Sequence, residues 1–537
     1  MSTQIPGQHK GDHVTKMEGP TGYHSYSEEE KTAFVEFINM HLSGDPDLEG
    51  VVPIDSSGDD IFKKVHDGIL LSKMINVAKE GALDERALTK KKLNIYNIQA
   101  NQCLCINSAK AIGCSVVNIG AQDIIEGRPM LVFALMWQII RIKLTSKINL
   151  KDHPELYRLL EEGETIEDFL KMPPEHILLR WFNYHLKAAN HSRRVTNFTT
   201  DVQDGENYIV LLHQIAPMHC DLSGLEDTDP LKRGEFILSG AEKLGVKRFI
   251  KPADIASGNN KLNMSFTAQL FNMWPALAPL ETMDDKLKIL IDEDDSAENR
   301  EERSFRNWMN NVGIETFVNN LFTDLKDGFV LLQLLDKLKP GCINWSKVNK
   351  PPVKNVFKMN ENTNYALQEA RDQGCSLVGI GGADISRGHR QFTLAITWQL
   401  RRQYMMSYLQ ELAKKQGKPA YTEQSLLAEA NEQVQKAGKT SMITGYNDPS
   451  IKTSRFLWDL IGTIEPRAID EELFRTGGEG EEEKKDQEMN AKYAIAAARK
   501  IGCSIFCLWE DIVEVNPKMI LTMVGAIIAE GHKVTEE

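Results

Sequence analysis

The chain has 537 residues, of which 42% are hydrophobic and 26% charged, which is ordinary for a globular protein and too long for one domain. Its net charge of −13 argues against general binding to nucleic acid or acidic membranes. The longest apolar run, Pro129 to Ile140, is too short to cross a bilayer, and residues 1–26 lack the apolar core of a signal peptide. We therefore expect a cytoplasmic protein with no membrane insertion.

A polar extension over residues 1–27 precedes a first domain that we place at residues 28–145. This domain opens with a helix from Glu28 to His41, whose apolar residues recur at helical spacing. Its most distinctive stretch is Asp67-Gly68 followed by an apolar run to Ile75. Asp67 suits a helix N-cap, because its carboxylate can accept from the unpaired N–H groups of the first turn. The apolar run predicts a helix that is buried on nearly every face.

The second half of this domain contains a Gly-Cys-Ser segment at Gly113 and a last helix that begins at Pro129 and passes Trp137. Proline suits the first turn of a helix, where its missing N–H costs nothing. Arg86 and Lys90-Lys91-Lys92 form a local basic cluster. The cluster is either a solvated face or a contact for an acidic partner.

A charged linker over residues 146–171 follows, with a short helix expected around Leu156–Glu162. We place a second domain at residues 172–278, a charged linker at 279–300 and a third domain at 301–406. The opening helices of the first three domains share an aromatic-x-Asn pattern, which ends in Asn39, Asn183 and Asn310. We interpret this pattern as an anchor for the core.

The second linker contains Asp292-Glu293-Asp294-Asp295, which resembles the start of an EF-hand calcium loop. However, Ala297 stands where the loop needs glycine for its sharp turn, and Arg303 stands where it needs a bidentate glutamate. We therefore expect no calcium site here.

The fourth domain, placed at residues 420–535, is the most divergent. Thr453-Ser454 occupies the Asp-Gly position, and either residue can cap a helix. Gly477 to Glu483 is an acidic, glycine-rich insertion, for which the composition predicts a mobile loop.

The four domains repeat in pairs. Gly113 and its surroundings match Gly374 and its surroundings at a constant shift of 261 residues, whereas Gly245 matches Gly502 at a shift of 257. The period is too long for a solenoid and fits a domain of common size. The first domain thus pairs with the third and the second with the fourth, which predicts a duplicated two-domain unit with two similar binding sites.

The Asp-Gly helix, the Ala-x-x-x-Gly-Cys-Ser segment and the Trp-containing last helix resemble calponin-homology (CH) domains. Four of them in tandem resemble the actin-binding core of the fimbrin (plastin) family of filament cross-linkers. The stretches from Leu93 to Ala109 and from Asp123 to Pro129 are similar to that family's first domain. The resemblance covers roughly residues 28–535 and implies an all-α fold, with four tandem CH domains arranged as two pairs in a compact core.

No catalytic motif is found in its required context. There is no P-loop, no His-Glu-x-x-His and no Gly-x-Ser-x-Gly, and the glycines near Ile380 are not flanked by alternating strands and helices. The eight cysteines have no zinc-site spacing and are expected to be reduced thiols. We therefore predict no enzyme activity, no catalytic residues, no cofactor and no metal.

The family resemblance implies binding and bundling of actin filaments, two per molecule, by a monomer of the cytoplasmic actin cytoskeleton. Without a calcium-binding headpiece, either removed or naturally absent, bundling is expected to be calcium-independent. Two alternatives stay open, because the CH fold does not fix the ligand. The chain could bind or stabilise a single filament, or bind another polymer such as microtubules.

Actin is acidic, so a chain with a charge of −13 must bind it through local apolar area and local basic residues. The resemblance directs attention to Asn118–Arg141 and Gly379–Arg402, the loop and last helix of the odd domains. We interpret Phe133, Trp137, Ile396 and Trp398 as core residues. The predicted contacts lie near the helix starts and are Asn118, Gln122, Glu126, Arg128, Met130, Gly381, Arg387, His389 and Arg390.

Overall fold

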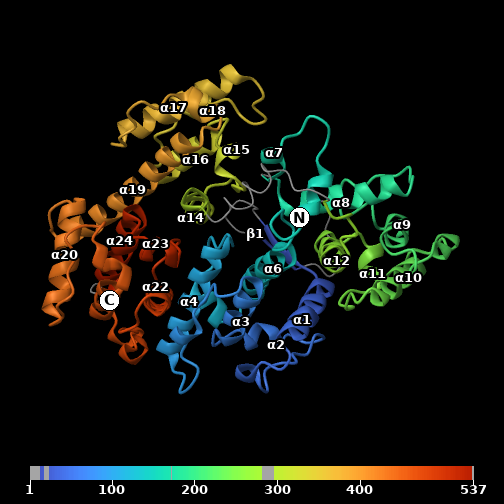
Figure 1. The fold of residues 1–537 in the computed structure, drawn as a ribbon, viewed down its shortest axis with the longest axis horizontal. Helices are drawn as coiled ribbons and strands as arrows, with labels where there is room; N and C mark the ends of the chain where they lie inside the picture. The colour runs from blue at the N-terminus through green and yellow to red at the C-terminus, as the bar shows by residue number, and fades with distance from the viewer. Residues whose placement is uncertain (1–12, 17–22, 171, 281–295, 535–537) are drawn as a thin grey trace, which may run out of the picture.

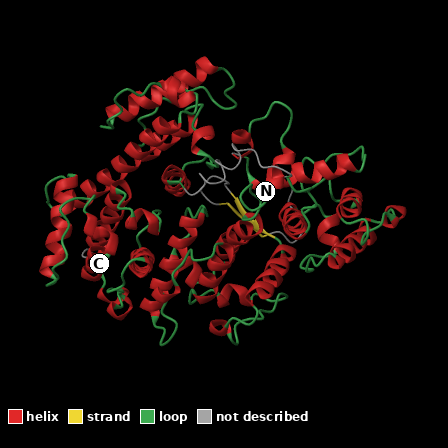
Figure 2. Cartoon of the chain, viewed as in Figure 1, coloured by secondary structure: helices red, strands yellow, loops and turns green. Residues whose placement is uncertain are grey.

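The computed structural model describes residues 13–16, 23–170, 172–280 and 296–534 (Figure 1). Helices joined by loops make up these ranges, apart from one antiparallel pair of short strands, β1 (His13–Lys16) and β2 (Tyr23–Tyr26), drawn in yellow in Figure 2. The predicted all-α class is confirmed, and the short sheet is the one feature that it did not include. No helix in the described ranges is both long and apolar enough to cross a bilayer.

Four sets of helices follow one another along the chain. The first domain contains α1 (Glu28–Leu42), α2 (Asp60–Lys64), α3 (Ile69–Ala78), α4 (Ile95–Ile112), α5 (Ala121–Ile125) and α6 (Pro129–Thr145). The second contains α8 (Pro174–Ala188), α9 (Glu206–Ile215), α10 (Pro230–Lys243), α11 (Pro252–Ala256) and α12 (Asn260–Met273). The third contains α14 (Ala297–Val312), α15 (Leu321–Asp324), α16 (Phe329–Leu338), α17 (Val356–Asp372), α18 (Gly382–Ser386) and α19 (Arg390–Lys415). The fourth contains α20 (Glu423–Lys436), α21 (Arg455–Ile464), α22 (Glu481–Lys500), α23 (Trp509–Val513) and α24 (Pro517–Val534).

Short 3₁₀ helices complete the domains, and the linker between the first two domains holds one of them. The 3₁₀ helices are η1 (Pro46–Leu48), η2 (Glu85–Ala87), η3 (Pro154–Leu159), η4 (Ser223–Glu226), η6 (Trp345–Lys347), η7 (Pro449–Thr453), η8 (Pro466–Ala468) and η9 (Glu471–Leu473). The short helix predicted around Leu156–Glu162 is present as the 3₁₀ helix η3, which begins two residues earlier and ends three residues earlier than expected. Leu156 and Leu159 are both buried and lie three residues apart, the spacing of one 3₁₀ face, and the next helix is α7 (Ile166–Leu170).

The central helices α3, α9, α16 and α21 are the buried helices that the sequence predicted, but they are capped differently. In the first three the N-cap is glycine in the left-handed region, with φ of 83° at Gly68, 76° at Gly205 and 73° at Gly328. The preceding aspartate still accepts from the first helical N–H, as Asp67 Oδ1 does from Ile69 at 2.9 Å. The prediction that Asp67 is the N-cap was therefore wrong by one residue, because only glycine adopts this backbone conformation without strain.

A side chain from a neighbouring helix holds each of these turns, and in three of the four domains it is a buried asparagine. Asn101 of α4 donates to the carbonyls of Asp67 and Thr89 and accepts from the Thr89 N–H at 2.9–3.0 Å. Asn362 in the third domain and Asn490 in the fourth make the corresponding three contacts. In the second domain Arg233 does this work instead, with bonds to the carbonyls of Asp204 and Asp227.

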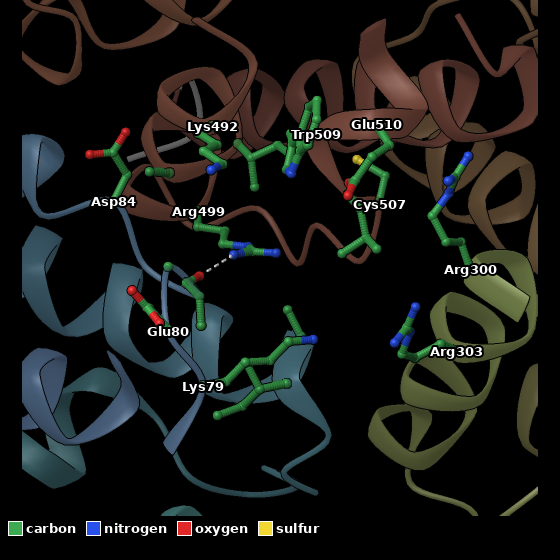
Figure 3. Close-up of a pocket in the computed structure, with 17 residues that line it drawn as sticks. Lys79, Glu80, Asp84, Arg300, Arg303, Lys492, Arg499, Cys507, Trp509 and Glu510 are labelled. Atoms are coloured by element: carbon green, nitrogen blue, oxygen red, sulfur yellow. Dashed lines mark hydrogen bonds between the residues drawn. The ribbon is translucent and has the colours of Figure 1, made fainter. Parts of the chain in front are cut away.

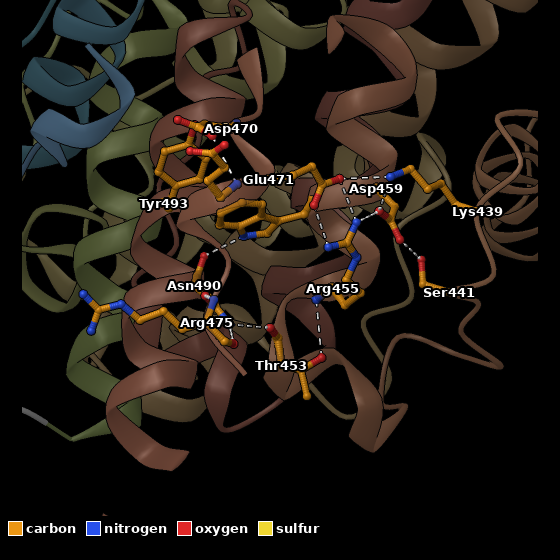
Figure 4. Close-up of polar contacts among 12 residues, drawn as sticks. Lys439, Ser441, Thr453, Arg455, Asp459, Asp470, Glu471, Arg475, Asn490 and Tyr493 are labelled. Carbon is orange, nitrogen blue, oxygen red and sulfur yellow. Dashed lines mark hydrogen bonds and ion pairs between the residues drawn. The ribbon is translucent and has the colours of Figure 1, made fainter. Parts of the chain in front are cut away.

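The fourth domain keeps the turn without the Asp-Gly pair (Figure 4). Thr453 Oγ1 accepts from the Arg455 N–H at 3.4 Å, so Thr453 takes the place of the aspartate. Ser454 adopts the left-handed conformation with φ of 63°, is fully buried, and has no hydrogen-bond partner for its Oγ in the described ranges. Arg455 in turn pairs with Glu471 at 2.8 Å and with the buried Asp459. Bonds from Arg455 lower the pKa of Glu471 to about 2.

The opening-helix asparagine proves to be a hydrogen-bonded clip that all four domains share. Its side-chain amide donates to a backbone carbonyl and accepts the N–H of that same residue, at 2.7–3.1 Å. The pairs are Asn39 with Ile54, Asn183 with Val195, Asn310 with Val318 and Asn431 with Ile443. The predicted anchoring role is confirmed, and it extends to the fourth domain.

The stretch from Gly477 to Glu483 departs from its prediction. Glu481, Glu482 and Glu483 form the first turn of α22, and only the preceding residues are irregular. Carboxylates favour this position, because the N-terminal end of a helix carries partial positive charge.

Ser454→Gly should stabilise the fourth domain by about 1 kcal/mol. The change removes a left-handed non-glycine residue and a buried hydroxyl without a partner, which outweighs the added chain entropy of glycine. We expect amide hydrogen exchange in α21 to slow by about fivefold. Gly328→Ser, whose Cβ would lie 2.7 Å from the Thr363 nitrogen, should accelerate exchange in α16. Faster exchange in Ser454→Gly would contradict the assignment.

Asn310→Ala should destabilise the third domain by about 2–4 kcal/mol, because both the N–H and the C=O of buried Val318 lose their partner. Amide exchange in α14 and α16 measures the effect. Asn319→Ala is the matched control, since Asn319 is exposed and bonds only through its backbone. Equal exchange rates in the two variants would show that the asparagine clip adds nothing to the stability of the domain.

Candidate functional site

The last helix of each odd domain is fastened to the even domain that follows it by equivalent contacts. Arg141 of α6 pairs with Glu175 of α8, and Arg402 of α19 pairs with Glu423 of α20. A second pair joins opening helix to last helix: Glu30 with Lys261 at 2.7 Å, and Glu301 with Lys518 at 3.0 Å. Lys261 and Lys518 lie 257 residues apart, so the duplication seen in the sequence extends to the interfaces. The chain therefore contains two equivalent domain pairs.

The first domain also joins the two pairs, as Figure 1 shows, with the second and fourth domains at opposite ends. Asn107 of α4 donates to the carbonyl of Arg499 at 3.0 Å. Asn307 and Asn311 of α14 donate to the carbonyls of Ala111 and Cys114 at 2.8 and 3.1 Å. These contacts produce the compact core that the sequence predicted.

The basic cluster near residue 90 is only partly free. Arg86 pairs with Asp84 and donates to the carbonyl of Met489 in the fourth domain at 2.8 Å. Lys90 pairs with Asp47 and Glu85 at 2.7 and 2.9 Å, whereas Lys91 and Lys92 are exposed. Arg86 therefore serves the interface with the fourth domain and Lys90 an ion-pair network within the first domain, so only the two exposed lysines are available to a partner.

The predicted contacts of the first domain lie around α5 and the start of α6. Asn118 is exposed with φ of 61°, and its counterpart in the third domain is Gly379 with φ of 74°. Gln122 donates to Glu126 at 2.8 Å. Arg128 has 56% of its side chain exposed but already pairs with Asp123 at 2.6 Å and Glu126 at 2.8 Å. Its charge is thus largely neutralised within the domain.

The equivalent surface of the third domain is more basic. Arg387 stands where the first domain has Glu126, and it is exposed with no ion pair in the described ranges. His389 is exposed beside the ring of Phe392 at 4.5 Å. Arg390 is held by Glu298 and Asn299 at 2.6 Å. Gly381 caps α18, with its N–H donating to Asp384 at 2.9 Å.

The large apolar residues of this region behave as core. Phe133 and Ile396 are buried, while Trp137 and Trp398 are half-buried and pack against the core, Trp137 over Phe34 at 5.0 Å. The prediction for these four residues is confirmed. Met130, one of the predicted contacts, is also half-buried against the core and presents only part of its side chain.

Sequence reasoning missed one exposed apolar pair in each odd domain. Ile95 and Tyr96 begin α4 and are 70% and 67% exposed, and Val356 and Phe357 begin α17 and are 59% and 80% exposed. The two pairs lie 261 residues apart. The signal was present in the repeat itself, because both copies keep an apolar pair in the first turn, where a solvated helix would carry polar residues.

This apolar pair adjoins the predicted contacts. In the third domain α18 lies along the first half of α17, where Ser386 Oγ donates to Asn360 Oδ1 at 2.6 Å. Asn360 lies one helical turn after Phe357, and Arg387 directly follows Ser386. Lys354 and Lys358 flank the pair, are exposed and form no ion pair in the described ranges. We call Lys354, Val356, Phe357, Lys358 and Arg387 the third-domain patch.

Of the corresponding first-domain residues, Tyr96 is less exposed than its counterpart Phe357. The guanidinium of Arg467, in the fourth domain, lies 5.7 Å from the centre of the Tyr96 ring. Phe357 has no such aromatic or cationic neighbour among the described residues. The two patches are thus chemically alike but differently surrounded.

The described ranges contain no group of three or more His, Cys, Asp or Glu residues placed to hold a metal ion. The two patches present exposed apolar area, and the third-domain patch adds unpaired cations, which together suit recognition of a partner.

Comparison with known proteins gives concordant results. The profile of the calponin homology (CH) domain family matches residues 28–145, 172–276, 299–406 and 421–533. The chain is 47% identical to fimbrin of Dictyostelium discoideum over 509 residues, covering 94% of this chain and 81% of that protein. It is 45% identical to plastin-3 of Rattus norvegicus over 523 residues, covering 95% and 81%. The solved structure of the actin-crosslinking core of Schizosaccharomyces pombe fimbrin superposes with a TM-score of 0.81 at 41% identity, covering 94% of this chain and all of that one.

Proposed function

Because the chain belongs to the fimbrin and plastin family of CH-domain proteins, we propose that each of its two domain pairs binds one actin filament. The chain binds and bundles actin filaments through its tandem CH domains, which is supported by its similarity to the actin-crosslinking core of the Schizosaccharomyces pombe relative. Two filaments per molecule, a monomeric state and a place in the cytoplasmic actin cytoskeleton are parts of the proposal. We assign it no enzymatic activity.

The duplication of the interfaces is the observation that carries the two-filament proposal. Both pairs keep the Arg–Glu and Glu–Lys contacts, and both odd domains keep an exposed apolar pair at the same place. A single-filament binder needs only one such unit. Once one pair is bound, a filament near the other pair is met at high effective concentration, which favours bundling.

The filament-facing surface is proposed to be the third-domain patch with its first-domain counterpart, together with the nine residues predicted from the sequence. With a net charge of −13, the molecule must rely on local cations and apolar area. Arg387 and the lysines beside Phe357 supply these in the third domain. In the first domain Lys91 and Lys92 precede Ile95 and Tyr96 in the chain, and Arg128 lies near the start of α6.

Phe357→Ser and Arg387→Glu should each weaken the third-domain site by roughly tenfold or more, since exposed aromatic and arginine side chains are frequent hot spots. The full chain should then still sediment with filaments at high speed, through its first pair, but bundle poorly at low speed. Arg128→Glu should act in the same way on the first pair.

Met218→Ser is the matched control, because Met218 is 90% exposed but lies in the second domain and belongs to neither patch. Combining Phe357→Ser with Arg128→Glu should also reduce sedimentation at high speed. The surface assignment is wrong if Arg128→Glu leaves both thermal stability and filament affinity intact and Phe357→Ser does the same.

The unmodified chain should pellet actin filaments at low speed, where only bundles sediment, and should leave microtubules in the supernatant. Bundling should be unchanged by a calcium chelator, since Ala297 and Arg303 are incompatible with an EF-hand loop; Asp292–Asp295 lie outside the described residues. High-speed without low-speed sedimentation would indicate a single-filament binder. Sensitivity to the chelator would refute only the calcium independence and would leave the bundling proposal standing.

A further inference from the structure

A cavity of about 290 Å³ lies where the first, third and fourth domains meet (Figure 3). The loop from Lys79 to Ala82 forms its first-domain wall, and α14 contributes Arg300 and Arg303 from the third domain. The fourth domain contributes Arg499 of α22 and the stretch from Cys507 to Glu510. None of the residues that line the cavity belongs to either patch proposed to contact filaments.

Arg499 is a buried cation without a carboxylate. It is 5% exposed, and its guanidinium donates only to carbonyls: Ala82 at 3.2 Å and Ile505 at 3.0 and 3.1 Å. It forms no ion pair with any described residue. Burial lowers its pKa to about 10, which still leaves it charged at neutral pH. A buried charge of this kind is costly unless a counter-charge lies close to it.

Arg303 faces the same cavity from the opposite wall, as Figure 3 shows. Its Nε is shielded from solvent without a hydrogen-bond partner, and the side chain makes no hydrogen bond or ion pair within the described ranges. The carboxylate of Glu510 also lines the cavity but pairs with neither arginine, and its Oε2 has no partner there either. The two guanidiniums thus face one space without a carboxylate bound to either.

Three other charged groups of the lining form ion pairs with residues that do not line the cavity, whereas the remaining two, Lys79 and Glu80, are exposed. Lys492 pairs with Glu488 at 2.6 Å, and Asp84 pairs with Arg86. Arg300 pairs with Glu514. Guanidinium groups present several N–H donors in one plane and match tetrahedral oxyanions well. The volume is at the lower end for ligand sites, which suits a phosphate-sized group and not a nucleotide.

We propose that this cavity binds a small phosphoryl oxyanion, such as phosphate, pyrophosphate or the phosphate of a small ester, between Arg303 and Arg499. The anion supplies the counter-charge that the protein does not. Both arginines belong to the second domain pair, so the anion bridges the third and fourth domains beside the first-domain wall from Lys79 to Ala82.

The test uses the full chain, with phosphate, pyrophosphate and glycerol 3-phosphate titrated separately at constant ionic strength against chloride. Thermal unfolding and calorimetry should both report saturable binding, because a ligand specific to the native state raises its stability. Comparison of the three probes separates a free ion from a phosphate ester. Absence of saturable binding by all three overturns the proposal.

Two substitutions in the cavity should act in opposite directions. Arg303→Gln should weaken binding by about tenfold or more, since charge-assisted bonds to the anion are lost. Glu510→Gln should strengthen binding, because it removes a competing negative charge, a gain that a merely destabilised variant does not produce. Arg387→Gln, an exposed arginine of the same domain, should titrate like the wild type. Unchanged affinity in Arg303→Gln overturns the proposal; if that variant does not fold, unchanged or weaker binding by Glu510→Gln overturns it.

Discussion

Each domain depends on one bidentate bond between an asparagine side chain and the backbone. The opening helix ends before a loop that must turn back beneath it, and this leaves a buried N–H and C=O of one loop residue to satisfy. The amide of asparagine offers one acceptor and one donor at the right separation, and it uses both on that residue. Neither aspartate nor leucine can do this, because the first lacks the donor and the second lacks both. The same solution therefore recurs in four otherwise divergent domains.

The left-handed turn before each central helix shows how much sequence variation the domain fold tolerates. Glycine is needed where a neighbouring helix backbone approaches, as Asn362 does at Gly328, and serine is accommodated in the fourth domain. The clamp that covers the turn changes from asparagine to arginine in the second domain, yet it still reaches a carbonyl of the turn. The fold conserves the bonded backbone group more strictly than the side chain that bonds it.

The sequence was sufficient for the four-domain organisation, the buried helices and the core position of Trp137, because periodicity and internal repeats report local burial. It misplaced the cap at Asp67, since glycine and aspartate both favour helix starts and only the backbone dihedral distinguishes them. It could not show that Arg128 is neutralised by Asp123 and Glu126, or that Arg86 serves the fourth domain, because such pairings depend on how distant segments meet. The exposure of Ile95 and Phe357 could have been predicted from the sequence, but only by comparing the repeats with each other.

The contacts of the first domain with the third and fourth have a mechanical consequence. If the two pairs hold separate filaments, a pull between these filaments is carried across the hydrogen bonds that α14 and α22 make with α4 and its following loop. Several of these bonds end on carbonyls of the loop and helix terminus, which are short segments with little slack. A tether of flexible chain would stretch under such a load before it resisted. A joint made of packed helices opposes even a small separation of the two pairs, so filaments held by this molecule would keep their spacing under tension.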